Sequence, residues 1–156
     1  MSHWIWQKKE DKDAGFSLVE LLIVVIIMGI LAAVAIPLFM QQRAKSEDAA
    51  AKSDVRTLAN EVSTFWADNP AGSTIAITGG TGIPYTITAT PLGGTADTST
   101  TPASKNVGTP VLEPSSGMTR NNWCVQVTNP EGKIKTFHVK AETGAGEGPC
   151  TPAASS

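Results

Sequence analysis

The sequence is poor in several features on which common functions depend. Among its 156 residues are 2 cysteines and 2 histidines, and aromatic residues make up 6% of the chain. The formal net charge is -2, and lysine and arginine are scattered along the chain. This balance excludes the broad basic field typical of nucleic-acid-binding proteins, so we expect no nucleic-acid site. His138 stands without a paired nucleophile or an acid cluster, so we expect neither an enzyme nor a cofactor or metal site.

Charge is also missing from one long stretch of the chain. Between Asp13 and Arg43 the only charged residue is Glu20, which stands at the start of an apolar run over residues 21–40. That run has the length of about 20 residues that a membrane-spanning helix needs. A carboxylate so close to hydrocarbon costs free energy unless it is paired. Glu20 is therefore a candidate functional residue.

A polar leader, residues 1–15, precedes the apolar run. Its lysines, Lys8, Lys9 and Lys12, favour the cytoplasmic side of a membrane. A secretory signal peptide has an apolar core of about 7–15 residues and is cut after it. Here the apolar run is longer, and the small residue Gly15 lies before it. Cleavage after Gly15 would leave the apolar segment on the product.

The helical pattern continues beyond the apolar run. Apolar residues recur at three- and four-residue steps and form one stripe, made of Val55, Leu58, Ala59, Val62, Phe65 and Trp66. Polar residues such as Asp48 and Asp54 are expected on the other faces of the helix. The segment Asn69-Pro70-Ala71-Gly72 is a strong helix breaker. We therefore predict a nearly continuous helix over residues 17–68, with an apolar half and an amphipathic half.

Two residues weaken the apolar half of this helix. Gly29 has a lower helix propensity than alanine, and Pro37 lacks the amide hydrogen that a helix interior uses. We expect a helix irregularity at these positions, where local melting would let neighbouring helices pack closely. The alternative, that a helix in lipid simply tolerates glycine and proline, stays open.

The chain beyond residue 70 predicts short strands and loops. Residues 74–78 and 85–90 alternate β-branched residues and are predicted strands. Residues 95–104 contain six serines or threonines, and we expect an exposed loop there. The clearest β pattern is a hairpin formed by residues 122–128 and 133–140 around a four-residue turn.

The hairpin has a predicted register. Pairing Thr128 with Lys133 places alternate side chains of its first strand on the face that packs against the helix stripe. These side chains are Trp123, Val125 and Val127. Their partners on that face would be Ile134, Thr136 and His138.

The two cysteines, Cys124 and Cys150, are expected to form a disulfide. A membrane-targeting N-terminus places the following domain in an oxidising compartment, where disulfides persist. Free thiols or half of a metal site are the alternatives. A zinc site would lack ligands, because the chain has no CxxC and His138 is its only histidine outside the leader. On the predicted register Cys124 lies beside Phe137, and residues 141–150 fold back to bring Cys150 to it.

One run of the chain is similar to the N-terminal signature of type IV pilins and related prepilin-like proteins, namely Gly15-Phe16-Ser17-Leu18-Val19-Glu20-Leu21-Leu22-Ile23-Val24-Val25. The resemblance covers the leader and the helix, residues 8–68. It implies cleavage after Gly15 by a membrane-embedded prepilin peptidase and N-methylation of the new terminal Phe16. It also implies that the apolar half-helices pack into a filament core, where Glu20 meets the terminal amine of a neighbouring subunit.

The patterns and the resemblance together imply an α+β fold. A long N-terminal helix, with a membrane-spanning half plus an amphipathic half, packs on a small antiparallel β-sheet with a disulfide-closed C-terminal region. The expected parts are the leader peptide 1–15, a transmembrane or filament-core helix 16–42, an amphipathic helix 43–69 and a Thr/Gly-rich β head domain 70–156.

The resemblance implies a structural, non-enzymatic subunit of an extracellular type IV pilus filament. Its expected partners are further copies of itself in a helical homopolymer, the prepilin peptidase and the pilus assembly machinery. As a prepilin it would cross the cell membrane once, and when mature it would lie at the cell surface. The close alternative is a pseudopilin of a type II secretion or DNA-uptake machine, which shares the whole motif. A bitopic membrane protein with a small ligand-binding domain is the alternative from another class.

Overall fold

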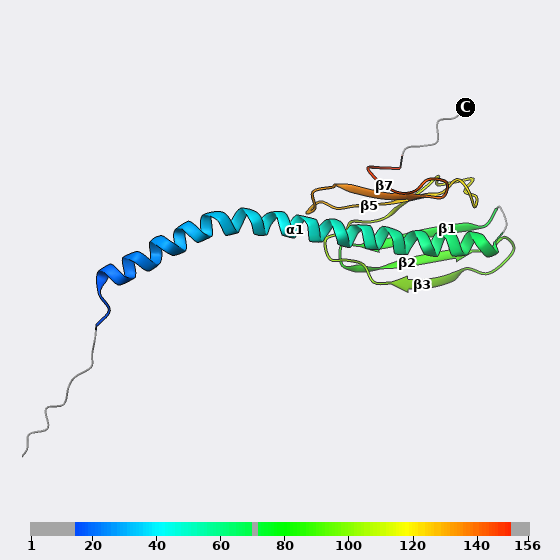
Figure 1. Cartoon of the computed structure of the whole chain (residues 1–156). Helices are drawn as coiled ribbons and strands as arrows, with labels where there is room; N and C mark the ends of the chain where they lie inside the picture. The colour runs from blue at the N-terminus through cyan, green and yellow to red at the C-terminus, as the bar shows by residue number, and fades with distance from the viewer. Residues whose placement is uncertain (1–14, 70–71, 151–156) are drawn as a thin grey trace, which may run out of the picture. The chain divides into compact units, whose positions relative to one another are not determined.

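The computed structural model describes residues 15–69 and 72–150 (Figure 1). Apart from Gly15, the expected leader lies outside the described residues. The chain divides into two compact units, Met1–Phe39 and Met40–Ser156. The expected division of the mature chain at residues 42 and 69 stays a prediction.

The long helix α1 spans Leu18–Asp68, which confirms the predicted continuous helix. Its end is held by side chains that bind the last carbonyl oxygens, which have no partner inside a helix. The Nδ2 of Asn69 donates to the carbonyl of Phe65 at 2.9 Å. Arg120 donates from Nε to the carbonyl of Trp66 at 3.0 Å and from a second nitrogen to the next carbonyl. The cation also favours the negative end of the helix dipole.

The first sheet is antiparallel, with the order β1-β2-β3. Its strands are β1 (Thr74–Gly80), β2 (Ile83–Thr90) and β3 (Asp97–Thr101), so the two strands predicted here are confirmed. The expected exposed loop over residues 95–104 is wrong, because β3 lies within it. Its serines and threonines were interpreted as loop residues by polarity, yet threonine is well suited to a half-exposed strand beside β2.

The second sheet has the order β4-β5-β6-β7 and is also antiparallel. It consists of β4 (Val111–Glu113), β5 (Cys124–Thr128), β6 (Thr136–Lys140) and β7 (Gly144–Glu147). The hairpin β5–β6 was predicted from the sequence, whereas β4 and β7 were not. Both unpredicted strands are short, and β7 has the sequence GAGE, which carries no β-branched residue.

The register of the hairpin differs from the prediction. Thr128 pairs with Thr136 instead of Lys133. Because side chains alternate along a strand, this shift of an odd number of residues turns β6 over. Phe137 therefore lies in the core opposite Val127, and His138 points to the other face. The expected neighbourhood of Cys124 and Phe137 is wrong for the same reason, since Cys124 lies opposite Lys140.

The core lies between the amphipathic part of α1 and the two sheets (Figure 1). All six residues of the predicted helix stripe are buried in it. Phe65 and Trp66 pack edge to face at 5.0 Å between ring centroids. The sheets contribute Ile75, Tyr85, Ile87, Trp123, Val125, Val127 and Phe137. The predicted inward face of β5 is thus confirmed, although its partners on β6 are not the predicted ones.

Candidate functional site

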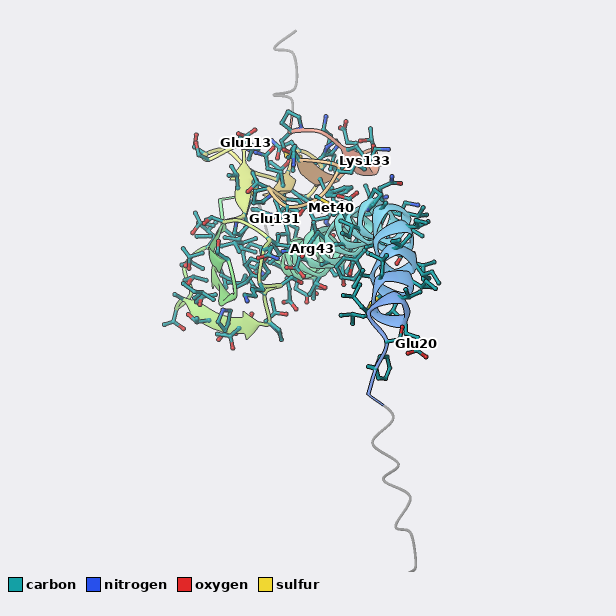
Figure 2. The ribbon with its side chains drawn as sticks, turned by 90° about the vertical axis from the view of Figure 1, so that its left-hand side faces the viewer. Glu20, Met40, Arg43, Glu113, Glu131 and Lys133 are labelled. Atoms are coloured by element: carbon teal, nitrogen blue, oxygen red, sulfur yellow. A yellow bond between two sulfur atoms is a disulfide. The ribbon has the colours of Figure 1, made fainter. Side chains whose placement is uncertain are left out.

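The candidate site begins where α1 begins. The side-chain oxygen of Ser17 accepts a hydrogen bond from the backbone N–H of Val19 at 3.2 Å. In return, the carboxylate of Glu20 accepts one from the backbone N–H of Ser17 at 2.9 Å. This reciprocal arrangement over Ser-x-x-Glu is a capping box, which satisfies two of the amides that a helix start leaves free. Figure 2 labels Glu20 at this first turn.

The geometry adds an intrachain role to Glu20 that the sequence interpretation had not assigned. Its negative charge lies in the first turn, where the helix dipole favours an anion. The signal is present in the sequence, because Ser17-Leu18-Val19-Glu20 has the Ser-x-x-Glu spacing of a capping box. Glu20 is exposed, and an ionised carboxylate has acceptor capacity beyond the one bond to Ser17. A second donor can therefore approach it without breaking the cap.

The helix that follows presents apolar side chains in every direction. From residue 18 to residue 40 each large apolar side chain is at least 47% exposed. Among the described residues, α1 holds the one segment that is long and apolar enough to cross a membrane. A surface of this kind, apolar all round, requires lipid or other helices as its surroundings.

The two residues that were expected to weaken the helix, Gly29 and Pro37, lie inside this apolar segment. α1 continues through both Gly29 and Pro37. A Cβ added at Gly29 would meet no atom within 4 Å, so the chain's own fold leaves this position open to a neighbour. Irregularity at these residues within an assembly stays a prediction.

The amphipathic part of α1 carries acidic residues that sequence reasoning placed on solvated faces. Asp54 is instead 7% exposed and accepts three hydrogen bonds. The donors are the hydroxyl of Tyr85 at 2.8 Å, and the amide and the hydroxyl of Ser104 at 2.8 and 2.9 Å. Burial, with the hydrogen bond to Asp54 and its charge, raises the pKa of Tyr85 above its ordinary value. No spacing signal pointed to this cluster, because its three members are far apart in the chain.

A second acidic residue holds the loop of the β5–β6 hairpin. The Oδ1 of Asp48 accepts hydrogen bonds from the Nδ2 of Asn129 at 2.8 Å and from the amide of Ile134 at 3.0 Å. Asn129 is fully buried, and its own Oδ1 accepts from the amide of Gly132. These contacts fix the longer hairpin loop and with it the observed register. The nearby ion pair of Arg43 and Glu131 spans 3.8 Å between exposed side chains (Figure 2) and adds little stability.

The expected disulfide between Cys124 and Cys150 is confirmed, with 6.0 Å between the Cα atoms. It closes a loop with a sequence separation of 26. The amide of Cys150 also donates to the side chain of Gln126, and the amide of Gly148 donates to the carbonyl of Thr136 at 2.9 Å. The carbonyl of Gly148 accepts a further hydrogen bond from the Nδ1 of His138 at 2.8 Å. The segment after β7 is thus held against the hairpin by one covalent bond and three hydrogen bonds.

The capped helix start and the exposed apolar helix coincide with a known motif. The prokaryotic N-terminal methylation motif matches residues 11–36. The N-terminal segment of the chain is therefore similar to that of type IV pilins and related prepilin-like proteins, which confirms the resemblance seen in the sequence.

The similar proteins include both a pilin and proteins of a secretion system. The type IV major pilin protein PilA of Myxococcus xanthus is 40% identical over 65 residues, which are 42% of this chain and 30% of that protein. Type II secretion system core protein G of Escherichia coli is 36% identical over 59 residues, 38% of this chain and 41% of the relative. The core protein G of Pseudomonas aeruginosa is 34% identical over 58 residues, which are 37% of this chain and 41% of that protein.

The chain spans less than half the length of each of these relatives. No solved structure matches the chain. The relatives are a pilin and secretion-system core proteins rather than enzymes, in agreement with the non-enzymatic role expected from the sequence.

Proposed function

We propose that this chain is a structural subunit of an extracellular type IV pilus, cut after Gly15, N-methylated at Phe16 and assembled through its apolar half-helix. The observation that carries the proposal is the exposed apolar helix, whose capped, acidic first turn lies within the methylation motif. Before assembly the helix would lie in the cell membrane as a single span. In the filament the helices of other copies would replace the lipid, with the pilus assembly machinery driving the exchange.

Glu20 supplies the selective contact in this proposal. Cleavage creates a positively charged amine at Phe16, beside a helix N-terminus whose dipole disfavours a cation. The amine therefore gains from meeting a carboxylate, and Glu20 keeps acceptor capacity while it caps its own helix. In an apolar filament core an unpaired charge is strongly penalised, whereas a matched pair is tolerated. Only the register that brings amine and carboxylate together avoids this penalty.

The second candidate function is that of a pseudopilin in a type II secretion or DNA-uptake machine. The relatives named core protein G favour it, because they are 36% and 34% identical to this chain over 59 and 58 residues, against 40% over 65 residues for the pilin. Both functions use the same processing and the same helix. They differ in where the polymer ends, at the cell surface or within the envelope.

The first experiment tests processing. The chain is expressed with a prepilin peptidase, purified from membranes in detergent and measured by intact-mass spectrometry. We expect the mass of residues 16–156 plus one methyl group, and fragment ions that place the methyl group on Phe16. A bulky side chain at the cut, Gly15→Trp, should leave the leader attached. A wild-type product that retains Lys12 would overturn both the pilus and the pseudopilin proposal.

The second experiment separates the two functions. Filaments sheared from the surface of cells that express the chain are purified, imaged by electron microscopy and analysed by peptide mass spectrometry. We expect surface filaments that contain this chain and are lost on its deletion. Normal surface filaments in the deletion strain, together with a defect in protein secretion, would favour the pseudopilin and overturn the pilus assignment.

A further inference from the structure

The outer edge of the first sheet belongs to β3. The strand order places β2 between β1 and β3, and β1 lies against β4 at the other edge. Figure 1 shows β3 at the rim of the head, with β2 on its inner side. Residues 97–100 are exposed and Thr101 is half-buried. A strand in this position presents backbone donors and acceptors along its free side, a ready template for another strand.

Proteins usually protect such an edge, and this molecule does so at β7. That strand is short, begins at Gly144, which has a φ of 78°, and contains a second glycine, Gly146. Its last residue, Glu147, places a charge at the edge and pairs with Lys52 at 3.8 Å. Short length, glycine and charge are all known ways of discouraging an added strand.

In β3, by contrast, no glycine and no charge lies in the interior of the strand. Its sequence, DTSTT, has no lysine, proline or glycine. Its pairing with β2 is regular from Ala89↔Asp97 to Tyr85↔Thr101, without a bulge. Its one charge, Asp97, lies at the strand end, where its Oδ1 accepts a hydrogen bond from the amide of Thr98 at 2.8 Å. The edge is therefore straight, polar and open.

The strand is also complementary to itself. In an antiparallel pair related by a two-fold axis at Ser99, Thr98 of one copy lies opposite Thr100 of the other, and Asp97 lies opposite Thr101. The two Asp97 carboxylates are then at opposite ends, so no like charges face each other. Threonine pairs directly across two antiparallel strands are favourable, partly through their hydroxyl groups. A two-fold interface of this kind uses the same surface on both copies and closes on itself.

The outer face of the sheet continues this pattern. Thr86 pairs with Thr100, and Thr88 pairs with Thr98, so threonines of the two strands share one face. A second copy added at β3 would extend this uncharged threonine face across the new strand pair. The extended sheet would have the same kind of surface on both sides of the two-fold axis.

From this geometry we propose that β3 is a docking edge for β3 of a second copy of this chain, paired antiparallel about Ser99. The occupant is a second copy rather than an unrelated peptide, because two copies of this edge pair threonine with threonine and keep their Asp97 carboxylates apart. The proposal rests on the head alone and is independent of the processing and filament assignment above.

Cysteine cross-linking tests the pairing directly. Both native cysteines are in the disulfide, so a cysteine introduced at Ser99 is the single free thiol of the chain. Opposite residues in an antiparallel pair have Cα atoms about 4.5–5.5 Å apart, within the range that a disulfide spans. We expect Ser99→Cys in detergent-solubilised full-length protein to form a disulfide-linked dimer under mild oxidation. The matched control is Thr74→Cys, which is also exposed but lies on β1.

A mixed cross-link tests the register. Differently tagged Thr98→Cys and Thr100→Cys proteins are mixed and oxidised, and the dimers are separated on non-reducing gels. We expect at least five-fold more mixed dimer than dimer of either variant with itself. In the proposed register residue 98 of one copy faces residue 100 of the other, whereas two copies of the same residue are offset by two positions along the strand. The proposal is overturned if Ser99→Cys dimerises no more than Thr74→Cys, or if like and mixed dimers form equally. Thermal melts of each variant check that the head remains folded.

Discussion

Asp54 on α1 accepts a hydrogen bond at 2.8 Å from Tyr85 on β2, across a sequence separation of 31 residues. The same carboxylate binds the amide and the hydroxyl of Ser104, which follows β3. One buried side chain thus attaches the helix to the first sheet and to the segment that leaves it. The arrangement places polar atoms in the core, and each of the three donors has the same acceptor residue.

Removing this acceptor should destabilise the head. Asp54→Ala leaves the buried Tyr85 hydroxyl and the half-buried Ser104 amide without their partner, and hydrogen bonds to a charged group are worth more than neutral ones. We expect a loss of about 2–4 kcal/mol in the free energy of unfolding, measured by urea denaturation in a mild detergent. Glu61→Ala, an exposed acid on the same helix, is the matched control and should change the value by less than about 0.5 kcal/mol. Equal effects of the two substitutions would contradict the anchoring role.

Tyr85 is the chain's single tyrosine, which makes its ionisation directly visible. Burial and Asp54 raise its pKa above the ordinary value of about 10. In the unfolded chain the proton leaves near pH 10, while the folded protein holds it. The stabilisation is therefore intact below about pH 10 and is lost as the pH rises above it. We expect tyrosinate absorbance to appear near pH 10 in urea, and in the native protein only at higher pH or on unfolding.

The control for this titration is Tyr85→Phe, which should show no tyrosinate signal and a smaller loss of stability between neutral and strongly alkaline pH. A native protein that ionises its tyrosine near pH 10 while fully folded would contradict the burial of this hydroxyl.

Local patterns predicted the helix and the strands with alternating β-branched residues, because neighbours in the sequence determine them. The apolar stripe along α1 and the breaker after Asp68 were sufficient for its bounds. The register of β5 and β6 was not predictable in the same way. It depends on Asn129 and Asp48, which are remote in the sequence and meet only in the folded head. Short strands such as β7 lack a pattern and form because longer neighbours offer an edge.

The same difference between local patterns and tertiary contacts applies to the functional residues. Gly15, Phe16 and Glu20 were predicted from the sequence, since they lie close together at the start of the apolar run, and their roles in processing and assembly stay predictions. The buried role of Asp54 was missed, because an acid among helix polar residues looks the same whether its partner is water or a distant hydroxyl. Only the tertiary contact with Tyr85 distinguishes the two cases.

The Cys124–Cys150 bond should carry a large share of the head's stability. A loop of this length implies about 3–4 kcal/mol from the chain-entropy estimate. We expect the Cys124→Ser, Cys150→Ser double variant to unfold at a clearly lower urea concentration than the wild type. Chemical reduction of the wild type should produce the same shift, and reduction of the double variant should produce none. Unchanged stability after complete reduction would contradict this account.

The two roles of Glu20, helix cap and charged partner, can be separated by substitution. Glutamine at this position of a capping box still accepts the Ser17 amide hydrogen bond but carries no charge. Leucine removes both the acceptor and the charge. Ser17→Ala removes the bond to the Val19 amide and leaves the charge of Glu20 in place.

If the charge selects the assembly register, Glu20→Gln and Glu20→Leu should both deplete sheared surface filaments by at least ten-fold, while processing at Gly15 continues. Ser17→Ala should reduce filaments much less, since losing a helix cap costs only about 1 kcal/mol. The measurement is the amount of chain in the sheared fraction relative to membranes, with intact mass reporting cleavage. Normal filaments from Glu20→Gln, with depletion confined to Glu20→Leu, would assign the requirement to the cap and remove the amine–carboxylate pair from the proposal.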